Sequence, residues 1–110
     1  MAQDDRRRAP RADIALTAMV LARHNDGIAF TIDSISTSGA RLAGPLTLDV
    51  GERVQIMFEI DGRPVDVHAE VVRREPRDIT MDNIAVRFTD LTDDARAAIH
   101  AAVLKRLEQY

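Results

Sequence analysis

The feature that most constrains the fold is a pair of alternating segments joined by Asp61-Gly62. Before this dipeptide, apolar residues occupy every second position, at Val54, Ile56, Phe58 and Ile60. After it, the same period returns at Val65, Val67, Ala69 and Val71. Because successive side chains of a strand point to opposite faces, this period predicts two half-buried strands. Asp-Gly tolerates the positive φ of a two-residue loop, so we expect a β-hairpin here.

Similar alternation elsewhere predicts further short strands. It begins at Ala12 and places four residues on one side, Ile14, Leu16, Ala18 and Val20. It resumes after the turn signal Asn25-Asp26-Gly27, at Ile28, Phe30 and Ile32, again in residues 40–43, and last at Ile84, Val86 and Phe88. Gly44-Pro45 and residues 49–52 are expected turns, and the charged residues 73–78 are an expected loop.

The end of the chain changes to a helical period. Thr92 can cap a helix with its hydroxyl, and Asp93 and Asp94 suit the positive end of the helix dipole. Apolar residues then recur at near-helical spacing, at Ala95, Ile99, Val103, Leu107 and Tyr110. We therefore expect one amphipathic helix over residues 92–110.

Six short strands followed by one helix predict a mainly β fold. An open sheet of this size would expose unpaired edges, so we expect residues 12–91 to close into a six-stranded antiparallel barrel. The helix should pack against the barrel or across one of its mouths. Residues 1–11 have no periodicity, and Pro10 disfavours helix at Ala9, so a flexible N-terminal arm is expected. At 110 residues, these parts make one domain.

Composition excludes several classes of function. The chain has no cysteine, which excludes disulfides and a cysteine nucleophile, and its three histidines share no metal-ligand spacing. There is no phosphate-cradling glycine loop and no nucleophile elbow, so we expect neither a bound cofactor or metal nor enzymatic activity. No apolar stretch is long enough to cross a bilayer, and the first residues do not resemble a signal peptide. A cytoplasmic protein without membrane insertion is expected.

The most basic stretch is Arg6-Arg7-Arg8-Ala9-Pro10-Arg11, in a chain of net charge -3. With a pI near 5.5, the molecule as a whole repels polyanions, so a bound anion needs a local basic patch. Arginine suits such a patch because its planar fork donates two hydrogen bonds to a phosphate or to a guanine edge. The stretch is thus a candidate for one half of an anion-binding site. The alternative interpretations of the stretch are a solvated basic tail and a weak nucleic-acid-binding arm.

A second polar stretch, Asp33-Ser34-Ile35-Ser36-Thr37-Ser38-Gly39, interrupts the alternation. Together the two stretches resemble the PilZ domain family, which has an RRxxxR motif near the N-terminus and a [D/N]xSxxG motif at the end of an early strand. Arg6, Arg7 and Arg11 match the first motif. Ser36 and Gly39 match the second, and Ser34 stands where the family has Asp or Asn. The resemblance extends through the strands to the helix start at residues 90–92.

This resemblance implies a PilZ-type barrel that binds cyclic di-GMP, changes the conformation of its arm and signals to a protein partner. It implies that Arg7 and Arg11 hold phosphate and guanine, assisted by Arg6. Ser36 would bond the nucleotide, and Gly39 would allow backbone torsions or a close approach that a Cβ obstructs.

Position 34 is where this chain departs from the family motif. Asp or Asn can accept from the N–H groups of guanine, whereas the hydroxyl of Ser34 reaches less far. Asp33 is expected to face away from Ser34, because neighbouring strand residues point to opposite sides unless a bulge intervenes.

Two alternatives to a cyclic di-GMP receptor stay open. One is a degenerate PilZ domain that binds no nucleotide and serves as a protein interaction module through the barrel edge or the helix. The other is a nucleic-acid-binding barrel, which the acidic pI and the presence of only four aromatic residues disfavour. No nucleic-acid polymer is therefore expected as a partner. The sequence selects neither a downstream protein, nor the number of ligand molecules bound, nor an oligomeric state.

Overall fold

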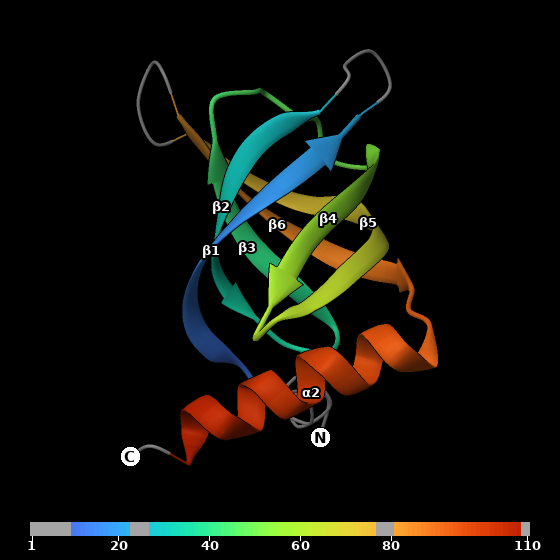
Figure 1. Ribbon diagram of the computed structural model, residues 1–110. Helices are drawn as coiled ribbons and strands as arrows, with labels where there is room; N and C mark the ends of the chain where they lie inside the picture. The colour runs from blue at the N-terminus through green and yellow to red at the C-terminus, as the bar shows by residue number, and fades with distance from the viewer. Residues whose placement is uncertain (1–9, 23–26, 77–80, 109–110) are drawn as a thin grey trace, which may run out of the picture.

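A computed structural model describes residues 10–22, 27–76 and 81–108 of the chain (Figure 1). It contains a closed antiparallel barrel of strands in the spatial order β1-β2-β3-β6-β5-β4, followed by a helix. The elements are β1 (Ala12–Leu21), β2 (Ile28–Ile35), β3 (Gly39–Gly44), β4 (Arg53–Ile60), β5 (Arg63–Pro76), β6 (Asp82–Asp90) and α2 (Asp93–Leu107). The predicted six-stranded barrel with a C-terminal helix is confirmed. Of the expected arm, residues 1–9 lie outside the described residues.

The β4–β5 hairpin forms where Asp-Gly predicts it. Asp61 and Gly62 have φ values of 50° and 80°, as a two-residue hairpin loop requires. Strand β5 then continues to Pro76, so the predicted loop is wrong for residues 73–76. These residues pair with β6 from Asp82 onward, and Arg74 Nε donates to the Asp82 carboxylate at 3.0 Å. A strand needs a pairing partner for its backbone more than it needs an apolar face, which explains the extension.

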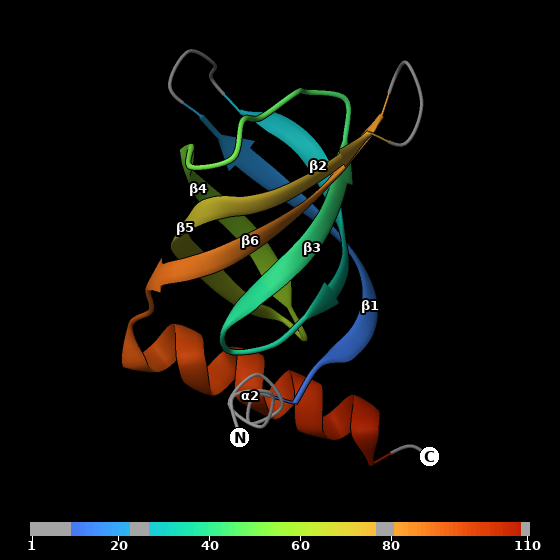
Figure 2. The same ribbon diagram turned by 180° about the vertical axis from the view of Figure 1, so that it is seen from behind.

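The core fills the barrel and continues into the helix. The largest fully buried side chains of the strands point inward, among them Phe30, Ile32, Leu42, Ile56 and Ile60. Helix α2 lies across one end of the barrel (Figures 1 and 2) and packs against β1, β4 and β5. Its buried face consists of Ala95, Ala98, Ile99, Ala102 and Val103, and the three alanines let the helix approach closely. The barrel mouth at this end is thereby closed.

The two ends of α2 differ in how well the sequence predicts them. Thr92 caps the helix as expected, because its Oγ1 accepts from the Ala95 amide at 3.0 Å. Leu107 was predicted to be part of the buried stripe, but its side chain is 40% exposed. The last turn of the helix extends past the barrel wall (Figure 1). Tyr110 lies outside the described residues.

A bulge near the end of β2 changes which side its residues face. Ile32 pairs with Leu42 and Ser34 pairs with Arg41, so Asp33 is an extra residue without a partner in β3. The pairing of β2 with β1 is interrupted at the same level. A bulge lets two residues of one strand oppose one residue of the other, which breaks the alternation. Asp33 and Ser34 consequently both face the outer wall, which corrects the expectation that Asp33 faces away from Ser34.

Candidate functional site

Arg11 connects the N-terminal segment to the end of β2. Its Nη1 donates a hydrogen bond of 2.9 Å to the hydroxyl of Ser34, which is 7% exposed. Burial lowers the pKa of Arg11, and the nearby charge of Arg41 lowers it further. Arginine remains protonated at physiological pH, so two cations, Arg11 and Arg41, lie near each other here. The structure thus brings Arg11 and Ser34 together, whereas Arg6 and Arg7 lie outside the described residues.

The serine residues after β2 form a tight corner between β2 and β3. The Ser36 amide donates to the carbonyl of Gly39 at 2.9 Å. The Ser36 hydroxyl accepts from the Ser38 amide at 3.1 Å and lies 2.9 Å from the Ser38 hydroxyl. Ser36 is 1% exposed, so its side chain holds the turn together from within. Its contact with a nucleotide stays a prediction.

Gly39 has a structural reason to be glycine. Its φ is not in the left-handed region, so no special torsion requires it. A Cβ at this position would lie only 2.1 Å from the carbonyl oxygen of Val86 on β6. The close approach of β3 to β6 therefore excludes a side chain here, independently of any ligand.

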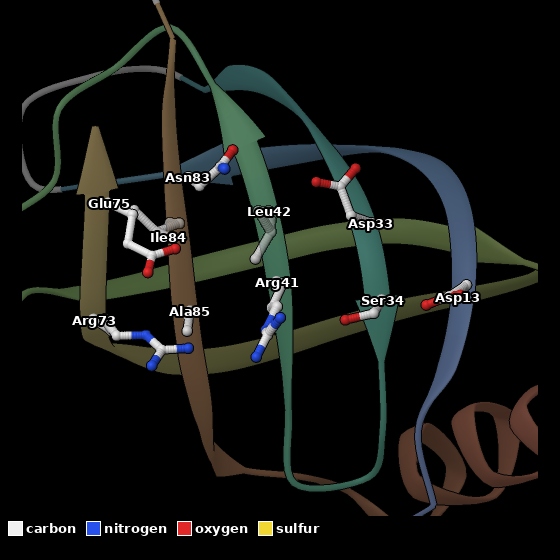
Figure 3. Close-up of a pocket in the computed structure, with 10 residues that line it drawn as sticks. All are labelled: Asp13, Asp33, Ser34, Arg41, Leu42, Arg73, Glu75, Asn83, Ile84 and Ala85. Carbon is white, nitrogen blue, oxygen red and sulfur yellow. The ribbon is translucent and has the colours of Figure 1, made fainter. Parts of the chain in front are cut away.

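A row of outward side chains crosses the barrel wall beside this corner (Figure 3). Asp13 pairs with Ser34, and Ser34 pairs with Arg41. Arg41 and Arg73 both pair with Ala85, one from each side. The row lines a cavity of about 230 Å³ whose other walls are Asp33, Leu42, Glu75, Asn83 and Ile84.

This first cavity is rich in hydrogen-bond acceptors. It contains the carboxylates of Asp13, Asp33 and Glu75. Asn83 Oδ1 is buried and has no hydrogen-bond partner in the described part of the chain. A carboxylate can accept two donors at once, as the N1–H and N2–H₂ edge of guanine presents. The cavity therefore suits the donor edge of a purine.

A second, more open hollow of about 490 Å³ adjoins the row on the side of the serine corner. Four arginines and no carboxylate are among the residues that line it. Arg87 is neutralised by Glu70, with 2.7 Å between nitrogen and oxygen. Among residues 10–22, 27–76 and 81–108, no carboxylate forms an ion pair with Arg11, Arg41 or Arg73. These three guanidinium groups can therefore donate to an anion.

The family model of the PilZ domain matches residues 5–105 of the sequence. The chain belongs to the PilZ domain family. The match includes the arginine stretch, the serine corner and nearly the whole of α2, so the resemblance found in the two motifs is confirmed. A comparison of this PilZ domain with curated proteins gave no match.

Several solved structures share the fold of this PilZ domain at low sequence identity. The inhibitor of motility MotI/DgrA from Bacillus subtilis has a TM-score of 0.79 and 17% identity, over 94% of this chain and 52% of its own. The PilZ domain of YcgR from Escherichia coli, solved with cyclic di-GMP, has a TM-score of 0.72 and 15% identity, over 94% and 93%. The PilZ domain of CeSA from a cellulose-synthesising bacterium has a TM-score of 0.63 and 17% identity, over 89% and 97%. This chain thus spans about half the length of MotI.

Sequence reasoning missed two residues of the PilZ domain wall, Arg41 and Arg73, and expected a third, Asp33, to face away from Ser34. Alternation alone places Arg41 outward, between Ala40 and Leu42, but does not say that β6 lies beside it. Arg73 was assigned to a loop because its segment lacks apolar alternation. Asp33 was misplaced because the bulge leaves no clear mark in the sequence. All three positions depend on strand pairing, which is not a local property of the chain.

Metal-binding clusters and membrane-spanning helices are both absent from residues 10–22, 27–76 and 81–108 of this PilZ domain. These ranges contain no group of three or more His, Asp or Glu side chains that could hold a metal ion. None of their helices is both long enough and apolar enough to span a bilayer.

Proposed function

We propose that this PilZ domain is a receptor for cyclic di-GMP. The observation that carries the proposal is the hydrogen bond from Arg11 to Ser34, because it joins the last arginine of the first motif to the first position of the second. Arg11 lines the hollow of four arginines, and Ser34 lines the cavity that holds three carboxylates together with Arg41 and Arg73. Cyclic di-GMP has two phosphates for the former and two guanines for the latter. The related YcgR domain, solved with this ligand, supports the proposal.

Arg11 donates to a neutral hydroxyl, and no carboxylate in the described part of the chain forms an ion pair with it. A phosphate competes well for this arginine, because hydrogen bonds between two charged groups are roughly twice as strong as neutral ones. Arg6 and Arg7 supply further donors, and Ser36 and Gly39 keep the corner in shape beneath the ligand. Asp33 and Ser34 both face the cavity, so Asp33 can accept from guanine where the motif residue is a serine. We assign the domain no catalytic role.

The signal passes from the ligand to a protein partner through the surface beside α2. Pro10 lines a cleft together with Thr37 of the serine corner and with Asp93, Arg96, Ala97 and His100 of the helix. When a ligand draws Arg11 away from Ser34, the neighbouring Pro10 moves with it and changes this cleft. A receptor for this bacterial second messenger would act in the cytoplasm.

Isothermal titration calorimetry with cyclic di-GMP tests the proposal. The wild type should bind saturably, and Arg7→Ala and Arg11→Ala should each weaken binding by about 100-fold, because each removes charge-assisted hydrogen bonds. Arg63→Ala is the matched control, since Arg63 is an exposed arginine of β5 outside both cavities. Unchanged affinity in both motif variants would refute the assignment.

A second candidate function is protein interaction without a nucleotide. One observation favours it. Met19 and Met57 pair across β1 and β4 and are 40% and 38% exposed, and flexible methionines suit protein contacts. Saturable binding of cyclic di-GMP by the wild type would count against this candidate, and no binding would favour it.

A further inference from the structure

Two arginines flank one small residue on the outer wall of the barrel. Arg41 of β3 and Arg73 of β5 are the direct partners of Ala85, which lies between them on β6. Neighbouring strands are about 4.8 Å apart, so the backbones of the two arginines are separated by about 10 Å. Figure 3 shows both guanidinium groups on the same side of the wall, on either side of the Ala85 methyl group. The gap between them is therefore bounded by donors and has a shallow floor.

The charges of these two arginines are not neutralised within the described part of the chain. Arg87, on the same wall, forms an ion pair with Glu70 at 2.7 Å. Arg41 and Arg73 have no such partner there, although Glu75 lines the same cavity. Arg11 adds a third positive charge to the hollow that Arg41 and Arg73 share with it. No carboxylate of the described residues lines this second hollow, so an anion bound there would reduce the repulsion among the three arginines.

We propose that Arg41 and Arg73 form a second phosphate site on the barrel wall, in which one phosphodiester of the bound cyclic dinucleotide lies over Ala85. The proposal rests on the proposed function and adds residues that belong to neither motif. The motif arginines hold one phosphate, and the wall arginines hold the other. Each guanidinium donates to a non-bridging oxygen of this phosphate, as its planar fork allows.

Ala85 is essential to this geometry because it leaves room for the phosphate. A larger side chain would fill the gap, and an acidic one would take the place of the ligand. Ala85→Glu is therefore a sharp test. The introduced carboxylate would face Arg41 and Arg73 as a cross-strand partner, which favours the fold, while it neutralises the charges that the phosphate needs.

The ligand itself provides a specific readout. The two phosphates of free cyclic di-GMP are equivalent by symmetry and give one ³¹P signal. Two different arginine sets make them inequivalent, so the bound ligand should give two signals. Loss of the wall arginines should return one signal toward its position in the free ligand and leave the other unchanged.

The experiment combines calorimetry and ³¹P NMR with cyclic di-GMP on the wild type, Arg41→Gln, Arg73→Gln and Ala85→Glu, with Arg63→Gln as control. We expect Arg41→Gln and Arg73→Gln each to weaken binding by about 10- to 100-fold, with melting temperatures close to that of the wild type. Ala85→Glu should abolish binding without lowering the melting temperature. The control should bind as the wild type does.

The outcomes separate this inference from the proposed function. If the wild type binds and both glutamine variants bind equally well, the wall site is wrong and the receptor function stands. If the variants bind weakly but both ³¹P signals stay at their wild-type positions, the arginines do not contact phosphate and the inference is overturned. If the wild type does not bind, both proposals are wrong.

Discussion

Two connections between strands lie at the barrel end that α2 covers, and they use the same residue types differently (Figure 1). One is the serine corner, residues 36–38, between β2 and β3. The other is the β4–β5 hairpin at Asp61 and Gly62. Gly39 directly follows the serine corner, and Gly62 lies within the hairpin. Arg11 is hydrogen-bonded to Ser34 of β2, beside the corner, and Arg106 is hydrogen-bonded to Asp61 of the hairpin. The comparison separates residues that hold the fold from residues available to a ligand.

The arginines differ in whether the protein neutralises them. Arg106 of α2 forms two hydrogen bonds with the Asp61 carboxylate, of 3.0 and 3.1 Å. The hydrogen bond with Asp61 raises the pKa of Arg106. Within the residues that the structure describes, Arg11 donates to the hydroxyl of Ser34 and forms no ion pair, and its pKa is lowered by burial and by the charge of Arg41. An arginine that is paired internally attaches the helix to the barrel, whereas an unpaired one keeps its charge for an anion.

The glycines differ in what they make possible. Gly62 has a φ of 80°, and a Cβ built on it would meet nothing within 4 Å. Gly39 has no unusual φ, but its Cβ would collide with the carbonyl of Val86. The hairpin thus needs glycine for its torsion, and the corner needs glycine for space.

The largest expected effect comes from testing this difference directly. Gly39→Ala should lower the free energy of unfolding by about 3 kcal/mol, the upper part of the range for overpacking, because the obstacle is backbone and cannot rotate away. Gly62→Ala should cost about 1 kcal/mol, the strain of a side chain in the left-handed region. Urea denaturation of both variants measures the two values. Equal stabilities would show that β3 and β6 do not approach as closely as described.

A smaller effect is expected at the bulge, on the ligand side of the comparison. Asp33→Ala should weaken cyclic di-GMP binding about tenfold, the loss of one good base-edge contact, and leave stability nearly unchanged because Asp33 is exposed. Cyclic di-IMP lacks the 2-amino groups, so the variant should lose less affinity for it. Calorimetry with both ligands measures this, and Glu59→Ala, an exposed acidic residue of β4 outside the first cavity, is the control. Equal losses for the two ligands would mean that Asp33 does not accept from the amino group.

The same comparison explains what the sequence could predict. The hairpin followed from Asp61-Gly62 and the flanking alternation, because turn chemistry and strand period are local. The meeting of Arg11 with Ser34 followed from the two motifs. The wall pair Arg41 and Arg73 did not, because it exists only when β3 and β5 are both placed beside β6. The bulge at Asp33 shifts the alternation by one residue, and no glycine, proline or asparagine at this point of the sequence indicates a bulge.

The smallest expected effect lies in the hairpin and depends on pH. The hydrogen bond from Arg106 holds the pKa of Asp61 below its ordinary value of 3.8. A lowered pKa in the folded state adds stability above that ordinary value, and this stability is lost as the pH falls through the folded pKa. Asp61→Asn keeps a residue that tolerates positive φ and removes only the charge.

At neutral pH, Asp61→Asn should therefore melt slightly below the wild type, by a few degrees at most, because the pair is partly exposed. The difference should shrink as the pH falls below 3.8 and vanish once the pH lies below the lowered pKa of Asp61. Arg106 does not contribute to this change, since it stays protonated throughout. Affinity for cyclic di-GMP should be the same in both proteins. A weakened affinity would mean that the hairpin and the serine corner communicate through α2, and the division between a structural arginine and a ligand arginine would then fail.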